Sequence, residues 1–495
     1  MPHRFEAFVF LFLIGSVMLI CPGCSGPEVP PNVLFIAIDD LRPELGCYGN
    51  DLIQTPNMDR IADQGFVFKK HYVQVPTCGA SRCALLTGMR PRSRQHLSNN
   101  VMAELMARAP EGEYPETLIH QFRRFGYHTA GIGKISHSAD GLVYGYEEAP
   151  SNVMELPYSW DEFLFDPGKW KTGWNAFFGY ASGENRQSLN KQVRPYEKGQ
   201  VEDDGYPDGL TTALALEKLG ELSTKDQPFL LGVGYFKPHL PFTAPEKYWD
   251  LYSDQEMPLP PFSGIPSDIS RASLHSSGEF NQYALGEEKA SLDTTLSDDY
   301  TRKLIHAYYA CVSYIDAQVG KLMQKLEELD LMDNTIVVIW GDHGWHLGDL
   351  RVWGKHTLSE YALRSTLIFR LPGNQPAHSS IESVVESVDI FPTLLDLCDI
   401  PLPGPIDGSS FAGKFKQSQV ESGQGLAYGY FRNGISLRTD SFRITKYFRE
   451  ESPTIELYDY NDDPAETANV AHEHPEIVSR LMPLLEKGNT GLYSN

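Results

Sequence analysis

The sequence Asn-Val-Leu-Phe-Ile-Ala-Ile-Asp-Asp at residues 32–40 is an apolar run that ends in two carboxylates. A continuous apolar run of this length is typical of a parallel strand that is buried on both faces. A second such run, Thr-Ile-Val-Val-Ile-Trp at residues 335–340, is followed by Gly-Asp-His. Because functional groups gather beyond the carboxyl ends of strands in open α/β sheets, the polar side chains after the two runs are predicted to share one edge of a sheet.

Strands and helices alternate along most of residues 31–400. Further strands are predicted at 128–132 and 228–235, and helices at 55–65, 117–126, 210–222 and 301–329. This alternation predicts an α/β fold with a large, mostly parallel central sheet flanked by helices on both faces. Residues 140–208 and 250–298 have weak periodicity and are rich in Gly, Pro, Ser and acidic residues. They are predicted to be long loops around the mouth of a site or, alternatively, decoration of the surface.

The sequence pattern changes after Pro-Leu-Pro-Gly at residues 401–404. Residues 434–447 and 455–460 alternate in the way of antiparallel strands, and a last helix is expected over about 475–488. We therefore predict a catalytic domain over residues 31–400 and a small C-terminal α+β subdomain with an antiparallel sheet over residues 401–495.

The first residues, 1–24, are predicted to be a signal peptide. Arg4 precedes an apolar run over residues 8–20, with small residues after it. The run is too short for a comfortable membrane span, and a buried core helix is the alternative. Cys24 follows a glycine, which leaves a lipid anchor open, although Cys21 stands where a lipoprotein signal usually has leucine. We expect an exported protein of the periplasm, cell surface or extracellular space.

Charge and cysteine content narrow the function further. The chain has 495 residues and a formal net charge of −23, which argues against a nucleic-acid partner. An anionic substrate would therefore have to be attracted by a local basic site. Outside residues 1–24 the cysteines are too few and too scattered for a disulfide framework, and their odd number indicates that one of them has a separate role.

That cysteine is identified by the sequence Cys-Gly-Ala-Ser-Arg-Cys-Ala-Leu-Leu-Thr-Gly at residues 78–88. It resembles the signature of the sulfatase family, Cys-x-Pro-Ser-Arg followed by Leu-Thr-Gly, with Ala80 as an accepted variant of the proline. In that family a formylglycine-generating or equivalent maturation enzyme oxidises the cysteine to formylglycine. The alternative, a small buried cysteine before a helix, does not account for the whole motif. Cys83 has no such context and is expected to pack in the core.

An aldehyde at position 78 suits the hydrolysis of a sulfate ester. Its hydrate carries two hydroxyl groups, of which one attacks the sulfur and the other then loses its proton, expels sulfate and restores the aldehyde. A serine would be left with a stable sulfate ester. If the group lies at the start of a helix, backbone N–H groups add donors for the anion.

A divalent cation is predicted beside residue 78. Three carboxylates and an imidazole, mostly oxygen ligands, favour a hard ion such as calcium or magnesium. The alternative is that these acidic residues cap helices after strands. Most sulfatases carry an amide where His343 stands, and the sequence at residues 342–345 instead resembles the iduronate-2-sulfatase branch of the family. The predicted ligands are Asp39, Asp40, Cys78, Asp342 and His343.

Fixed cations and histidines are predicted around the same centre, with their side chains pointing into one cleft. Sulfate needs cations that hold its oxygens, and a histidine near the bridging oxygen can protonate the leaving sugar hydroxyl. A single Lys or His after a strand is more often a solvated loop residue, but these match family motifs in order and context. The predicted catalytic residues are Cys78, Arg82, Lys134, His137, His239 and Lys355.

The resemblance extends from Asn32 to about Asn469 and is closest to the iduronate-2-sulfatase branch. It is carried by the segments 39–49, 237–242, 313–320, 342–345, 456–459 and 463–464. It implies an alkaline-phosphatase-like sandwich, one calcium ion and exo-acting hydrolysis of sulfate esters on a sulfated sugar or glycosaminoglycan-like oligosaccharide. Residues 90–100 and 140–208 show no clear match to this branch, so the resemblance does not identify the sugar of the substrate.

Within this interpretation a terminal uronate 2-sulfate is the expected substrate. Arg92, Arg94 and His96 are candidates to contact its carboxylate or a neighbouring sulfate, or are solvated loop residues. The enzymatic alternative is a phosphodiesterase or phosphonate monoester hydrolase of the same superfamily. A surface glycan-binding lipoprotein with a decayed site is disfavoured because no expected nucleophile, ligand or cation is missing.

Overall fold

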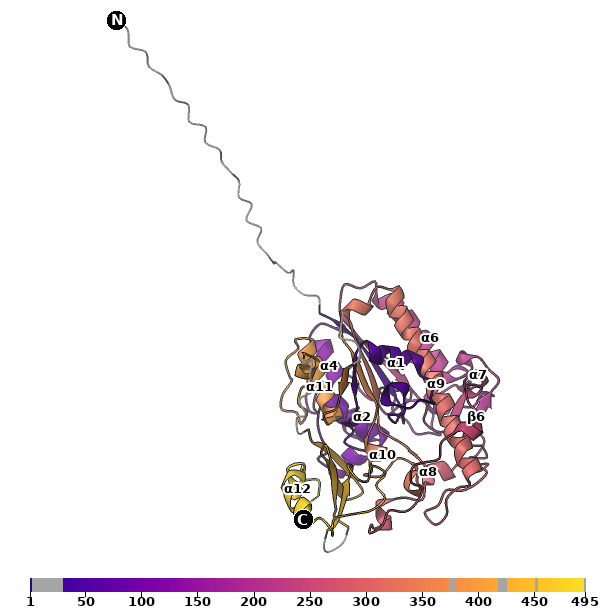
Figure 1. The fold of residues 1–495 in the computed structure, drawn as a ribbon. Coiled ribbons are helices and arrows are strands. Elements are labelled where there is room, and N and C mark those ends of the chain that lie inside the picture. Colours follow the sequence, from indigo (N-terminus) through magenta and orange to yellow (C-terminus); the bar gives the residue numbers. More distant parts are fainter. Residues whose placement is uncertain (2–29, 374–378, 417–424, 450–452, 494–495) are drawn as a thin grey trace.

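The computed structural model describes residues 1, 30–373, 379–416, 425–449 and 453–493. Its centre is an eight-stranded sheet with helices on both faces (Figure 1). In sheet order its strands are β13 (Ser379–Ile381), β2 (Phe66–Phe68), β12 (Leu367–Arg370), β9 (Thr335–Gly341), β1 (Asn32–Ile38), β7 (Phe229–Tyr235), β4 (His128–Gly133) and β5 (Glu162–Leu164).

The sheet is mostly parallel, as predicted, and its central strands end at one level. Ile38, the last residue of β1, pairs with Gly341 of β9 on one side and with Tyr235 of β7 on the other. The residues that follow these strands therefore emerge together at one edge. The short strand β12 is antiparallel to both β9 and β2 and was not predicted, because it is a brief apolar segment without a clear period.

Strand β1 is buried on both faces, which explains its uninterrupted apolar sequence. Alternate side chains enter two separate cores, with Leu34, Ile36 and Ile38 in one and Val33, Phe35 and Ala37 in the other. The first core is covered by α1 (Pro56–Asp63), α6 (Pro207–Leu222) and α9 (Asp298–Glu328), and the second by α2 (Cys78–Thr87), α4 (Leu118–Arg124) and α11 (Ile390–Leu397). Figure 1 shows these two helical layers on opposite sides of the sheet.

Two helices begin earlier than the apolar pattern indicates. Helix α9 begins at Asp298 because the Ser297 hydroxyl accepts the N–H of Tyr300, at 3.3 Å, and caps it. Helix α6 begins at Pro207, a residue suited to the first helical position. Residues 140–208 before it hold only short elements, among them α5 (Gly173–Phe177) and β6 (Tyr196–Gly199).

A four-stranded antiparallel sheet forms the predicted C-terminal subdomain. Its strands are β15 (Ala427–Phe431), β16 (Gly434–Arg438), β17 (Phe442–Tyr447) and β18 (Thr454–Asp459), and α12 (Pro475–Lys487) packs beside them near the C-terminus (Figure 1). Phe411 and Phe415 lie beyond residue 401 but pack against Phe68 of the main sheet. The boundary at residue 401 stays a prediction.

The predicted signal peptide, including Cys21 and Cys24, lies almost entirely outside the described residues. Within the described part of the chain, no helix has the length and apolar character needed to cross a bilayer. All cysteines in that part, Cys78 among them, are unpaired.

Candidate active site

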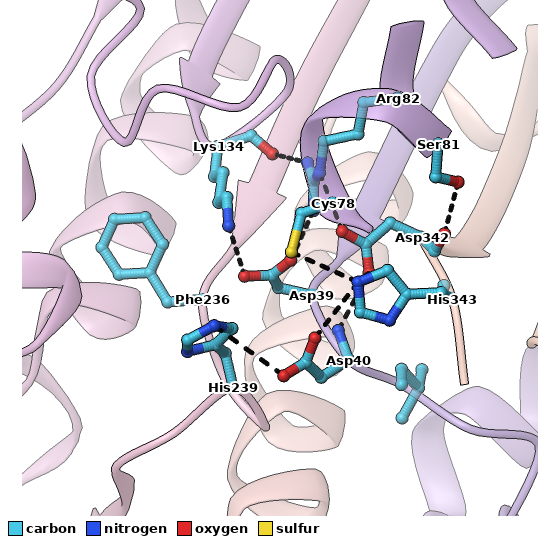
Figure 2. A network of polar contacts seen from close by, with 12 residues as sticks. Asp39, Asp40, Cys78, Ser81, Arg82, Lys134, Phe236, His239, Asp342 and His343 are labelled. Carbon is cyan, nitrogen blue, oxygen red and sulfur yellow. Dashed lines mark hydrogen bonds and ion pairs between the residues drawn. The ribbon is translucent and has the colours of Figure 1, made fainter. Parts of the chain in front are cut away.

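Two pairs of polar residues follow β1 and β9 and face each other at the edge of the sheet. The backbone N–H of Asp40 donates to Asp342 Oδ1 at 2.9 Å, which ties the two strand ends together. Asp40 has a left-handed backbone, with φ of 59°, and this breaks the alternation by which neighbouring strand residues point to opposite faces. Both Asp39 and Asp40 thereby reach the same space, as Figure 2 shows.

Cys78 is the first residue of helix α2, and its side chain is buried. Its Sγ lies 3.2 Å from His343 Nε2 and 3.2 Å from Lys355 Nζ. A side chain at position 79 would collide with the backbone of Asn99, so glycine is required there. The sequence after Cys78 therefore seats the helix start directly against the strand edge.

Arg82 lies one helical turn after Cys78 and is fully buried beneath it. Its Nη2 donates to Asp39 Oδ1 at 3.2 Å and its Nε to Asp342 Oδ2 at 3.0 Å. A further donor binds the carbonyl of Lys134. The guanidinium therefore fixes the two carboxylates from behind. It does not line the cavity above Cys78, where the sequence interpretation placed it.

Two lysines lie on the other side of the carboxylates. Lys134 follows β4, and its Nζ donates to Asp39 Oδ2 at 2.5 Å. Lys355 Nζ donates to Asp40 Oδ1 at 2.9 Å. Burial would lower the pKa of Lys355, but Asp40 and its other anionic neighbours outweigh it and hold the pKa well above its usual value. Lys355 is therefore a buried, permanent cation beside residue 78.

The three predicted histidines differ in their surroundings. The Nδ1 of His343 lies 3.0 Å from the Gly344 carbonyl, and because a carbonyl can only accept, Nδ1 carries the proton and Nε2 is left with its lone pair. Burial lowers the pKa of His343 to about 4, so the ring is neutral. Burial and Lys134 likewise hold the pKa of His137 well below its usual value. The Nε2 of His239 lies 3.1 Å from Glu279 Oε1.

The carboxylates respond differently to burial. Burial would raise the pKa of Asp39, but Lys134 and Arg82 outweigh it and hold the pKa well below its usual range. Burial and the neighbouring Asp39 instead raise the pKa of Asp342 to about 7. Burial also raises the pKa of Asp40, whose Oδ2 accepts no hydrogen bond. A buried carboxylate oxygen without a hydrogen-bond donor is costly, and a bound cation would supply the missing partner.

These donors fit a divalent cation. One atom from each of Asp39, Cys78, Asp342 and His343 lies within 4.8 Å of the others, and the same holds for Asp39, Asp40, Cys78 and His239. Buried carboxylate oxygens together with a neutral imidazole Nε2 are a ligand set suited to a hard ion. The sequence prediction did not include His239 among the ligands.

A cavity of about 540 Å³ opens above Cys78. Its wall contains His137, His239 and Lys355, whereas Lys134, like Arg82, is not among the lining residues. The rest of the lining comes largely from the two segments with weak periodicity, which thus surround the site and do not merely decorate the surface. These contributions include Tyr146, Phe178, Arg186, His275 and Glu279.

The charged residues that follow helix α2 do not line this cavity, although Asn99 of the same segment does. Arg92 pairs with Asp407, with 3.0 Å between Nη2 and Oδ2, and His96 bonds to Ser93 and Tyr114. Arg92, Arg94 and His96 are absent from the residues that line the cavity. The structure therefore does not support their suggested contact with the substrate. Glu279 and Arg186 were missed, because single charged residues in aperiodic loops carry no motif.

One glycine connects the sheet to Lys134. Gly234 of β7 lies beside the end of β4, and a side chain there would overlap the backbone of Lys134. We expect Gly234→Ala to lower the free energy of unfolding by about 1–3 kcal/mol and to reduce turnover by displacing Lys134. Gly220→Ala is the control, because nothing lies near that position in α6 and alanine favours helix. Denaturant unfolding and kcat check both variants; wild-type stability in Gly234→Ala would contradict the packing argument.

Residues 31–400 match the family model described as Sulfatase, and residues 341–489 match that of the N-sulphoglucosamine sulphohydrolase C-terminal region. A sulfatase of Formosa agariphila is 29% identical over 97% of this chain and 92% of its own length. Iduronate 2-sulfatase of Homo sapiens is 30% identical over 75% of this chain and 70% of its own length.

Solved structures show the same fold. An enzyme in complex with its substrate D-glucosamine-2-N,6-O-disulfate has a TM-score of 0.69 and 22% identity, over 93% of this chain and 97% of its own. A phosphonate monoester hydrolase from Silicibacter pomeroyi has a TM-score of 0.71 and 21% identity, over 94% and 96%. The expected alkaline-phosphatase-like architecture is thereby confirmed. The family model covers most of the chain, which therefore belongs to the sulfatases, a family of sulfuric ester hydrolases.

Proposed function

We propose that this protein removes a sulfate ester from a terminal sugar of a glycosaminoglycan-like oligosaccharide, with residue 78 as formylglycine and one calcium ion. The observation that carries the proposal is the position of Cys78 Sγ. It lies at a helix start, 3.2 Å from both Lys355 Nζ and His343 Nε2 and beside the buried carboxylates. A nucleophile at this place faces an anion-binding helix terminus and a cation site at once.

Asp39, Asp40, Asp342 and His343 would hold the calcium ion, with residue 78 at its open side. When bound, the ion supplies positive charge that polarises a sulfate oxygen and lowers the pKa of the attacking hydroxyl. Without the ion, the negative charges of the three carboxylates are balanced by Arg82, Lys134 and Lys355. No positive charge would then be left over for an anionic substrate. Because an ion would take over the carboxylate oxygens, it would also free both lysines to face the sulfate.

Residue 78 would act after oxidation by a maturation enzyme of the formylglycine-generating kind. The hydrated aldehyde supplies one hydroxyl that attacks sulfur while the S–O bond to the sugar breaks, and a second that loses its proton and expels sulfate. The N–H groups at the start of α2 point to the same side and stabilise the anion. Arg82 keeps Asp39 and Asp342 in place and is a positioning residue.

Lys134, Lys355 and His137 would bind the sulfate oxygens. His137 and Lys355 line the cavity together with residue 78, and the buried Lys134 donates to the neighbouring Asp39. A fixed charge in such a buried site is worth more than in water. Burial and Lys134 keep the pKa of His137 low, so this ring is a neutral hydrogen-bond donor and not an acid.

His239 would protonate the oxygen of the leaving sugar. The Nδ1 of His239 lies 2.6 Å from the Leu240 carbonyl, which fixes the ring, and Nε2 faces the cavity beside Glu279. In this orientation Nε2 is the ring atom that can transfer a proton to the leaving oxygen.

A uronate 2-sulfate is the substrate class that we propose. Support comes from the likeness to iduronate 2-sulfatase and from a cavity of about 540 Å³, which suits one or two sugar units. The acidic exterior disfavours long-range capture of a polyanion, so short oligosaccharides are favoured. We further propose that residues 1–24 direct export, with Cys24 as the candidate site for a lipid anchor.

Replacement of Lys355 by alanine tests the sulfate-binding role. We expect kcat/KM to fall about 10- to 100-fold or more, since a charge-assisted hydrogen bond in a buried site is lost. Lys169→Ala is the control, because that lysine is exposed and packs on Trp170 outside the cavity. An unchanged rate constant in Lys355→Ala would remove the residue from the mechanism.

The matured enzyme should be assayed on an aryl sulfate, an aryl phosphodiester and a panel of sulfated oligosaccharides whose products are mapped by mass spectrometry. We expect sulfate release, and from the non-reducing end only. Faster cleavage of the phosphodiester would favour the phosphodiesterase or phosphonate hydrolase reaction. Loss of internal sulfates with terminal ones retained would contradict exo action.

A further inference from the structure

The cavity contains a buried cation for which the mechanism has no use. Arg186 lies in the turn after α5, is only 4% exposed, and lines the cavity. Its guanidinium carbon stands 3.7 Å from the centre of the Phe178 ring and 5.6 Å from that of Tyr283. Its Nε has no hydrogen-bond partner, its polar neighbour Tyr283 is a neutral hydroxyl, and among the described residues no carboxylate forms an ion pair with it. A buried guanidinium without an anionic partner is costly, so its retention indicates a ligand.

The backbone holds Arg186 in this position. The N–H of Arg186 donates to the Phe178 carbonyl at 3.2 Å, and Asn185 Oδ1 accepts the N–H groups of Gln187 and Ser188. The same turn carries Lys191, whose N–H donates to the Arg186 carbonyl at 2.8 Å and whose side chain also lines the cavity. Arg186 is thus a fixed cation and not a solvated surface residue.

Arg186 is also close to the reaction centre. The adjoining ring of Phe177 lies 4.5 Å from the ring of His239, and Lys134 Nζ lies 4.2 Å from the centre of Phe177. The Phe178 ring, on which Arg186 stacks, lies 6.2 Å from His239. An anion held by Arg186 would therefore belong to the sugar that carries the scissile sulfate or to its neighbour.

We propose that Arg186, supported by Lys191, binds a second oxyanion of the substrate, either a carboxylate or a second sulfate. The planar guanidinium presents parallel N–H donors that match both groups. This inference rests on the proposed function and restricts its substrates to sugars that carry another anionic group within reach of the scissile one.

The test compares Arg186→Gln and Lys191→Gln with Arg194→Gln, which removes the same charge from an exposed position of the same segment that does not line the cavity. The substrates are an aryl sulfate, a uronate 2-sulfate and a disulfated amino sugar. We expect Arg186→Gln to lower kcat/KM on the dianionic sugars by about 10- to 100-fold, mainly through KM, with the aryl sulfate nearly unaffected. A larger loss of kcat/KM on the uronate 2-sulfate identifies the second group as a carboxylate. A larger loss on the disulfated amino sugar identifies it as a sulfate.

A binding measurement separates this inference from the proposed reaction. Calorimetric titration of the Cys78→Ala protein with the same two sugars requires no turnover. Adding Arg186→Gln to it should weaken the binding of at least one sugar by a similar factor, while adding Arg194→Gln should not. Equal affinities and equal kcat/KM in all variants would overturn the subsite. A wild-type protein that binds the sugars through Arg186 but releases no sulfate would overturn the proposed function alone.

Discussion

Replacing Cys78 with alanine is expected to abolish sulfate release and to leave the fold intact. The side chain is small and buried, and the variant removes the sulfur from which the proposed formylglycine would form. Without a hydroxyl at this position no covalent sulfate can form, so kcat should fall by about 10⁴-fold or more. Cys78→Ser should also be inactive, because its sulfate ester has no second hydroxyl to expel it. Sulfate release and thermal unfolding are the measurements.

Cys83→Ala is the matched control, because Cys83 lies on the same helix but packs in the core beyond it. We expect it to lose some stability through the small cavity and to keep its activity. Full turnover in Cys78→Ala would show that the reaction proceeds without residue 78, and the proposed mechanism would be wrong.

Asp342→Asn is expected to have the second largest effect, on cation affinity as well as on rate. Asp342 Oδ1 accepts the N–H of Asp40, and its Oδ2 accepts Arg82 Nε. The amide keeps the shape of the side chain but removes a negative charge from the proposed ion site. Its NH₂ group also faces either the Asp40 N–H or Arg82 Nε, both of which are donors. We expect calcium affinity to fall more than about 100-fold, measured by titration, with a matching loss of sulfate release.

Asp349→Asn is the control for Asp342→Asn, because it removes the charge of another buried carboxylate nearby. Asp349 pairs with Arg42 at 2.9 Å and is outside the ligand set. This variant should lose stability and retain calcium affinity. Equal calcium binding by wild type and Asp342→Asn would contradict the placement of the ion.

The strand ends of this fold could be predicted because each carries its own signal. An apolar run followed by Asp-Asp or Asp-His indicates both a buried strand and the polar edge beyond it, and the structure places Asp39 and Asp342 together. The order of the central strands brings in Lys134 and His239, after β4 and β7. These positions follow from local sequence and the rules of parallel sheets.

Other parts of the site depend on packing between distant segments and have no local signature. Arg82 was expected in the cleft, but its helix turns it beneath the carboxylates. Glu279 reaches His239 from a short helix in an aperiodic segment, and Arg186 enters the cavity from a loop turn. The charged residues after α2 were the more obvious candidates in the sequence, yet Arg92 pairs with Asp407 and does not line the cavity. Spacing in the sequence does not show which way a loop turns.

The central claim is tested most directly by one measurement: the rate of sulfate release from a uronate 2-sulfate, followed across preparations that differ in the oxidised fraction of residue 78. Peptide mass spectrometry gives that fraction, since conversion exchanges sulfur and two hydrogens for one oxygen. We predict that the rate rises in proportion to the oxidised fraction and vanishes when it is zero. A rate that does not depend on the oxidation of residue 78 would contradict the account.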